Sequence, residues 1–316
     1  MACNAVHADD ITISEESRTD GMALVTQEDG AVPFVIDAAD AEVVATAAQA
    51  VCGDIETVTG VRPAVLTSVP SAGTAVIAGT IGQSSLIDGM VKSGRLDVSG
   101  IKGKWEAFGL QMVENPVDGL DKALVVFGST PRGTAYALFE ISRLAGVSPF
   151  IWWADVAPQK RQALHVGGDR TLVGEPSVKY RGIFINDEDW GIWVWAKDNF
   201  ESDHGNMGPK TYAKVMELLL RLRANTLWPA MHHQTEAFWA NKDNLPVARR
   251  YDIVLGSSHC EQMLRDNLWE WDRYGGHGNS DFNYATNKAM VQKYWADRVG
   301  ESRGYDAIYT LGMRGV

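Results

Sequence analysis

From residue 181 onward, short apolar runs alternate with stretches whose apolar residues recur at helical spacing. The first strand, predicted at 181–186, contains an apolar run typical of a buried parallel strand and ends in a polar segment. The same pattern predicts strands at 226–231, 253–255 and 307–311, separated by helices at 209–224, 245–250 and 287–299. Such βαβ units in series form a doubly wound sheet or a (β/α)8 TIM barrel. We favour the barrel, because each predicted strand ends in polar residues rather than at one glycine-rich turn.

A closed barrel of this type needs eight strands and about 250 residues. Roughly 140 residues follow Arg181, which is room for about half of one. The expected fold class is therefore α/β: an N-terminal mixed-sheet α/β domain followed by the first half of a (β/α)8 TIM barrel. On this interpretation the chain is a fragment.

The first half of the chain has a different pattern of apolar residues. It predicts strands at 33–36, 64–69, 75–78, 106–113 and 123–127, with helices at 40–52 and 131–145. Asp37 or Asp40 is expected to cap the first helix, and Pro131 opens the second. We predict a tail at 1–30 that is a candidate signal remnant, a pre-barrel domain at 31–150, a connector at 151–177 and a partial catalytic barrel at 178–316. The turn at 128–133 lacks the phosphate-loop lysine and the full dinucleotide fingerprint, so an ordinary strand-to-helix turn is favoured over a phosphate site.

Composition and charge narrow the partner classes. The chain is 45% apolar and 22% charged, as is usual for a soluble globular protein. A formal net charge of −11 argues against a nucleic-acid or anionic-membrane partner. Its apolar runs fall short of the roughly 18 residues that span a bilayer. Three widely spaced cysteines match neither a disulfide framework nor a metal site.

The N-terminus gives one indication of location. Val6, His7 and Ala8 place small residues where a signal peptidase cleaves, although a charged n-region and an apolar h-region are lacking. We expect a secreted or periplasmic protein, with an arbitrary start of the sequence as the alternative.

Polar groups follow the first predicted barrel strand: Asn186, Asp187, Glu188, Asp189 and the indole of Trp190. Catalytic groups of α/β barrels lie at the carboxyl ends of the strands. Glycoside hydrolysis needs two carboxylates about 5–5.5 Å apart for retention or about 6.5–9.5 Å apart for inversion, and adjacent residues cannot easily supply both. We therefore expect at most one catalytic carboxylate here, with its partner on another strand. The alternative is a solvated loop that caps the next helix.

Tryptophans are concentrated in the same part of the chain, where ten of the eleven lie after residue 150. Indole faces pack well on the C–H faces of sugar rings, and the indole N–H can reach a hydroxyl. We expect Trp190 and Trp228 to contact a ligand. Others, among them Trp239, Trp269 and Trp271, are candidates for either ligand contact or core packing.

Two histidines and an arginine follow later strands. His232 lies in an HHxxE segment that lacks the zincin spacing, so we expect hydrogen bonding to a hydroxyl or carboxylate, or a structural role, rather than metal binding. His259 has the same two interpretations. Arg314 can bind a substrate carboxylate through two parallel hydrogen bonds or form a structural salt bridge.

Three ordered motifs and the preceding domain resemble the xylan α-1,2-glucuronidases of glycoside hydrolase family 115. The motifs are RGIFINDEDW at 181–190, LWPAM at 227–231 and LGMRG at 311–315, preceded by RGTAYALFEISR at 132–143 and PFIWWAD at 149–155. The resemblance runs from about residue 30 to the end of the chain. It implies an inverting hydrolase without metal or cofactor that removes glucuronic or 4-O-methylglucuronic acid from glucuronoxylan or its oligosaccharides. A homodimer of the full-length protein is compatible with this expectation.

The resemblance also implies roles for individual residues. Asp187 and Glu188 match the family's acidic pair, Trp228 the pocket tryptophan and Arg314 the arginine that meets the uronate. We expect Asp187 to take part in catalysis, without assigning it as acid or base. The His-Asp pair that follows this arginine in the family is absent, so the second catalytic carboxylate is expected beyond residue 316.

Two other functions fit the same pattern. One is another exo-acting glycosidase with a hexosaminidase-like pre-barrel domain, which would prefer N-acetyl sugars to uronates. The other is a non-catalytic carbohydrate-binding protein, in which tryptophans bind sugar and no carboxylate pair exists. A carboxylate at a later strand end would favour the enzymes.

Overall fold

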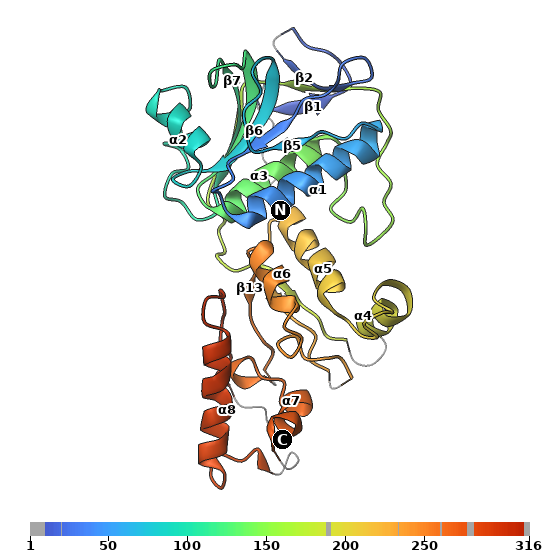
Figure 1. Cartoon of the computed structure of the whole chain (residues 1–316), viewed down its shortest axis with the longest axis vertical. Coiled ribbons are helices and arrows are strands. Elements are labelled where there is room, and N and C mark those ends of the chain that lie inside the picture. The colour runs from blue at the N-terminus through green and yellow to red at the C-terminus, as the bar shows by residue number, and fades with distance from the viewer. Residues whose placement is uncertain are drawn as a thin grey trace. The chain divides into compact units, whose positions relative to one another are not determined.

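The computed structural model describes residues 10–19, 21–187, 191–232, 234–259, 261–276 and 281–312. It divides into a first unit, Met1–Lys179 with Leu220–Leu222, and a second unit, Tyr180–Leu219 with Arg223–Val316. Both are mixtures of helices and strands, as the α/β prediction requires (Figure 1). In the described residues, no helix is long and apolar enough to cross a membrane.

The first unit is built on a six-stranded sheet in the order β10-β7-β8-β6-β4-β5. Its strands are β4 (Phe34–Ile36), β5 (Val65–Leu66), β6 (Thr74–Thr80), β7 (Phe108–Glu114), β8 (Lys122–Gly128) and β10 (Arg170–Val173). Strands β4, β5, β6 and β8 are parallel, whereas β7 pairs antiparallel with both β8 and β10. The sheet is therefore mixed, as predicted.

Both faces of this sheet are buried. Ala75 and Ile77 on β6 pack with Ile87 and Met90 of helix α2 (Ser85–Lys92). Val76 and Ala78, which alternate with them, are also buried. Helices α1 (Glu42–Thr59) and α3 (Pro131–Leu144) lie side by side (Figure 1). Burial on both faces explains why these strands are continuous apolar runs.

A second sheet in the first unit, together with β10 of the first sheet, corrects two predictions. It joins β1 (Thr12–Ser14), β9 (Leu164–Gly167), β2 (Met22–Thr26) and β3 (Gly30–Ala31) in the order β1-β9-β2-β3. The predicted tail at 1–30 is wrong for the residues in β1 and β2, and the predicted connector at 151–177 is wrong for β9 and β10. Strands of three to five residues are too short to show a sustained period. Their partners are also distant, about 150 positions away for β1 and β2 with β9 and about 60 for β10 with β7.

The second unit contains a three-stranded parallel sheet: β11 (Gly182–Phe184), β12 (Thr226–Trp228) and β13 (Val254–Leu255), in chain order. Leu255 forms one further parallel bridge with Ala307, where the fourth strand was predicted. The residues of β11 are exposed, contrary to the expected buried strand, because β11 is an edge strand with one neighbour in this sheet. Leu227 and Leu255 on the inner strands are buried.

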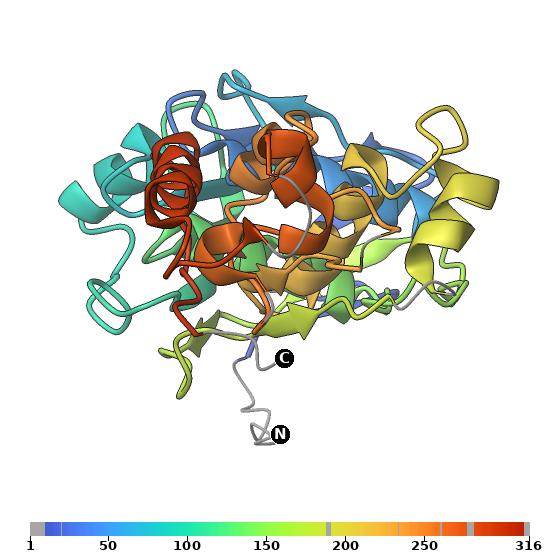
Figure 2. The same ribbon diagram turned by 90° about the horizontal axis from the view of Figure 1, so that it is seen from below.

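The second unit also contains helices. They are α4 (Ile192–Trp195) continued by the π-helix η1 (Ala196–Phe200), α5 (Pro209–Arg221), α6 (Asn244–Arg250), the 3-10 turn η2 (Gln262–Leu264), α7 (Asn267–Tyr274) and α8 (Lys288–Glu301). Helices α7 and α8 lie next to each other (Figures 1 and 2) and share an aromatic core around Trp271 and Tyr294. Helix α7 was not predicted. Trp271 is fully buried, which settles it as a core residue.

Candidate functional site

The carboxyl ends of the three parallel strands lie along one edge of the sheet of the second unit. Pairing of Phe184 with Trp228, and of Leu227 with Leu255, sets the strand ends at similar heights. The segments that leave this edge contain Asn186 and Asp187 after β11, His232 after β12 and His259 after β13. The structure therefore brings together four of the predicted site residues on neighbouring segments, at the edge where α/β barrels have their active sites.

Asp187 connects two of these segments. Its side chain is buried, at 3% exposure for the residue, and its Oδ1 accepts a hydrogen bond of 3.3 Å from the backbone N–H of His232. The carboxylate thus holds the beginning of the loop after β12, and the same bond fixes its orientation. Asn186, which precedes it, is exposed.

Trp228 lies at the end of β12 with 39% of its surface exposed. Its ring meets that of Phe184 edge to face, with centroids 5.7 Å apart, and Phe184 is 38% exposed. A Cβ added to Gly256 would lie 2.4 Å from Trp228 Nε1, so the indole position depends on glycine there. Sequence reasoning missed Gly256, whose only signal is a glycine directly after a strand.

In the HHxxE segment, Glu236 contacts residues of another loop. Glu236 Oε2 lies 2.8 Å from His204 Nε2, and the Glu236 backbone N–H donates to Asn206 Oδ1 at 3.2 Å. Glu236 thus binds the loop before α5. His232 is partly buried, while His259 is exposed and its carbonyl accepts from Gln262. In the residues that the structure describes, no group of three or more His, Cys, Asp or Glu is placed to hold a metal ion.

Two buried carboxyls close to this edge were not predicted. Burial raises the pKa of Glu261 to about 8, and the neighbouring charge of Asp266 acts in the same direction, against the N–H that Ser258 donates. Burial also raises the pKa of Asp266 to about 7, although Asp266 Oδ1 accepts from the N–H groups of Leu268 and Trp269 as the N-cap of α7. Only the N-cap position of Asp266, just before α7, is a recognisable signal in the sequence.

Glu261 and Asp266 line a cavity of about 10 Å³, together with Trp239 and Gly256. This is room for about one water molecule, so no sugar enters it. The nearby Glu270 is neutralised by Arg265, at 3.0 Å, and by Arg298. Glu261 and Asp266 are therefore buried beside the site and do not contact a sugar, whereas Asp187, Trp228 and the segments that carry His232 and His259 form its edge.

Three predicted site residues, Glu188, Trp190 and Arg314, lie outside the described residues. Their predicted roles stay predictions. Of the described ones, Asp187 and His232 are in contact, Trp228 is paired with Phe184, and Asn186 and His259 are exposed on neighbouring segments.

Comparison with known proteins shows a close relationship to one family. Residues 173–316 match the family model of glycosyl hydrolase family 115. The structure is similar, with a TM-score of 0.80, to that of a family GH115 4-O-methyl-α-glucuronidase with specificity for decorated arabinogalactans. The two are 42% identical over 93% of this chain and 37% of the other, so this chain spans little more than a third of that relative's length. No curated protein matches the sequence.

More distant solved structures also align with the chain. CpGH84D is 9% identical over 93% of this chain and 42% of its own, with a TM-score of 0.46. A chitobiase from Flavobacterium johnsoniae is 8% identical over 80% of this chain and 34% of its own, with a TM-score of 0.43. These similarities are too low to inform an argument about function.

Proposed function

Since this chain belongs to glycosyl hydrolase family 115, we propose that it provides one catalytic carboxylate and part of the sugar pocket of an α-glucuronidase. The substrate is a polysaccharide with (4-O-methyl)glucuronic acid side chains, and glucuronoxylan is the one we favour. The observation that carries the proposal is the 42% identity to a 4-O-methyl-α-glucuronidase over 93% of the chain. The placement of Asp187 and Trp228 at one sheet edge supports it.

The architecture that we propose for the second unit is half of a (β/α)8 barrel. The parallel order β11-β12-β13 and the Leu255–Ala307 bridge support it. So do Ile183 and Phe184 of the edge strand β11, which are 42% and 38% exposed and would be covered by further elements packed on the sheet.

The proposed reaction inverts the anomeric carbon. A carboxylic acid protonates the leaving sugar oxygen, while a carboxylate across the ring activates a water molecule. Asp187 is one of the pair, and its Oδ1 accepts the His232 N–H at 3.3 Å. The partner carboxylate comes from another strand end. Trp228, half-exposed beside Phe184, offers an apolar face to the uronate ring.

The test is release of 4-O-methylglucuronic acid from glucuronoxylan, followed by proton NMR during the first minutes. An inverting enzyme releases the β-anomer from an α-linkage, so early accumulation of the α-anomer would refute inversion. Glucuronidated arabinogalactan, assayed in parallel, decides the polymer class. Release of N-acetylhexosamine from chitobiose, with no uronate release, would instead favour the hexosaminidase-like alternative.

A further inference from the structure

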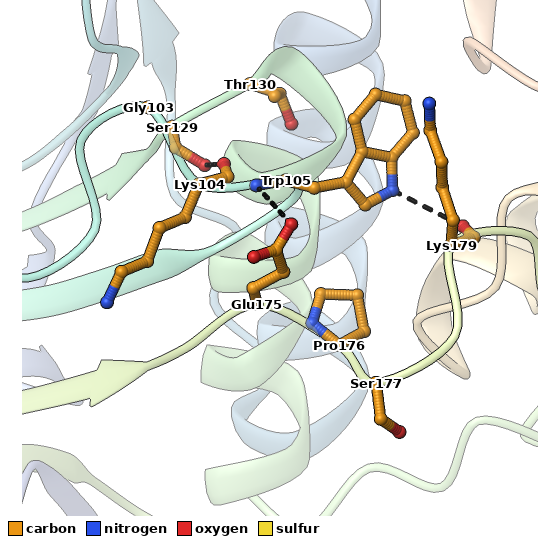
Figure 3. Close-up of a pocket in the computed structure, with 9 residues that line it drawn as sticks. All are labelled: Gly103, Lys104, Trp105, Ser129, Thr130, Glu175, Pro176, Ser177 and Lys179. Atoms are coloured by element: carbon orange, nitrogen blue, oxygen red, sulfur yellow. Dashed lines mark hydrogen bonds between the residues drawn. The ribbon is translucent and has the colours of Figure 1, made fainter.

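A second concave site lies within the first unit, away from the proposed catalytic edge in sequence. Its volume is about 720 Å³, within the usual range for small-ligand sites. Figure 3 shows its lining: Gly103, Lys104, Trp105, Ser129, Thr130, Glu175, Pro176, Ser177 and Lys179. The residues come from the loop before β7, the turn before α3 and the segment after β10.

Trp105 is the fixed wall of this pocket. Its backbone N–H donates to Glu175 Oε1 at 3.3 Å, and its indole N–H donates to the Lys179 carbonyl at 3.3 Å. The Lys179 ammonium lies 4.3 Å from the ring centroid and the Arg132 guanidinium 5.4 Å from it. The indole thus orders the segment that carries Lys179 before any ligand binds, which lowers the entropic cost of binding.

The residue after Trp105 makes the same region rigid. Glu106 has a φ of 50°, in the left-handed region that non-glycine residues seldom adopt. Its carboxylate is buried and accepts from Arg132 Nε at 2.7 Å. A buried ion pair therefore holds a strained turn directly beside the pocket, and such strain is concentrated at functional sites.

The pocket is cationic in an acidic chain. Its lining contains Lys104, Lys179 and Glu175, for a formal charge of +1, whereas the whole chain has −11. Lys104 Nζ donates one hydrogen bond, to the Gly100 carbonyl at 2.7 Å, out of the three that an ammonium can make. The hydroxyls of Ser129, Thr130 and Ser177 add further hydrogen-bonding groups.

The N-terminus of helix α3 is not the source of the pocket's positive charge. Thr130 Oγ1 accepts the Gly133 N–H at 3.2 Å, so the helix is capped by its own residue. This agrees with the prediction of an ordinary turn at 128–133. Any anion in the pocket would depend on the lysines.

We propose that this pocket is a non-catalytic binding site for an acidic saccharide, which holds the polymer while the uronate is removed elsewhere. The inference rests on the proposed function for its choice of a uronate-bearing ligand. Lys104 and Lys179 lie on opposite sides of Trp105 (Figure 3). Cations on both sides, with hydroxyl groups in the same lining, suit an extended ligand with spaced carboxylates and many hydroxyls better than a single small anion.

Affinity electrophoresis of this chain in gels containing glucuronoxylan tests the site. The variant Lys104→Ala/Lys179→Ala is expected to bind about fivefold to tenfold more weakly, since each exposed ammonium makes only a weak charge contact. The control Lys92→Ala/Lys160→Ala makes the same charge change at exposed lysines of the first unit outside the pocket and should leave binding unchanged. Equal retardation of both variants would overturn the proposal. So would equal retardation by unsubstituted xylan, or displacement by inorganic phosphate as effective as by glucuronoxylan.

A Trp228→Ala variant separates this site from the proposed catalytic edge. If Trp228→Ala alone abolishes binding, the pocket is not a binding site, although the α-glucuronidase proposal stands. If the lysine pair alone weakens binding and a longer form of the protein that contains the partner carboxylate releases no uronic acid, the catalytic proposal fails and the binding site stands.

Discussion

The six-stranded sheet of the first unit and the three-stranded sheet of the second bury different kinds of side chain. Along β6 and β8 nearly every position is apolar and buried, on both faces. Around the carboxyl edge of β11–β13 the buried residues include Asp187, Glu261 and Asp266, with Ser257 and Ser258 between them. Burying such groups is unfavourable unless hydrogen bonds or ion pairs compensate. The first sheet is therefore a packing core, whereas the second gives up stability to place polar groups at one edge.

The sharpest test of this comparison is Asp187→Asn in a preparation that releases uronic acid. The amide keeps an acceptor oxygen for the His232 N–H, so the fold should survive, but it cannot act as acid or base. We expect kcat to fall by about 10²- to 10⁴-fold, the usual contribution of such a group. Initial rates on glucuronoxylan measure this. Unchanged kcat would assign Asp187 a purely structural role.

Next in size is Arg298→Met, which removes one of the two cations beside buried Glu270. Breaking a buried pair by removing one partner costs about 3–5 kcal/mol, and we expect that loss in the free energy of unfolding. Urea denaturation followed by tryptophan fluorescence reports it. The control is Arg62→Met, whose pair with Glu56 is exposed at 44% and 49% and should contribute at most about 1 kcal/mol. Equal losses in both variants would contradict the comparison.

Glu261→Gln should change how stability depends on pH. The folded-state pKa of Glu261 is raised from 4.5 to about 8 by burial, so the unfolded chain loses this proton first. The contribution of Glu261 to the free energy of unfolding is then fully present below pH 4.5. It falls by up to about 1.4 kcal/mol per pH unit until about pH 8. The variant should lose this part of the slope, while Asp266 still contributes below about pH 7. Thermal melts between pH 5 and 8 measure it, with exposed Glu28→Gln as the control. A slope equal to that of the wild type would refute the prediction.

The smallest expected effect is that of Ile77→Val in the first sheet. Removing one methylene from this buried site should cost about 0.5–1.5 kcal/mol at every pH. Melts over the same pH range as for Glu261→Gln give the comparison. A pH-dependent loss would mean that the apolar sheet is coupled to the titration of the second unit.

Local patterns were sufficient for the long helices and for several strands, but not for α2, α7 or the short strands β1, β2, β9 and β10. The helix predicted at 131–145 is confirmed as α3, and the strands predicted at 123–127 and 226–231 contain or overlap β8 and β12. The expected cap of the first helix is wrong, since neither Asp37 nor Asp40 caps α1. Asp37 accepts from Ser85 at the start of α2, and Asp40 from the N–H of Thr80. Partners about 40 to 50 positions away cannot be identified from neighbouring residues.

By itself the sequence determined the α/β class, the parallel order of strands in the second unit and the family, because apolar periodicity and ordered motifs are local properties of the chain. Only the tertiary structure decided that β1 and β2 pair with β9, that Asp187 holds the loop of His232, and that Glu261 and Asp266 are buried together. Each of these depends on residues distant in the sequence meeting in space. Burial, and the rise in carboxyl pKa that it causes, depend on these tertiary contacts.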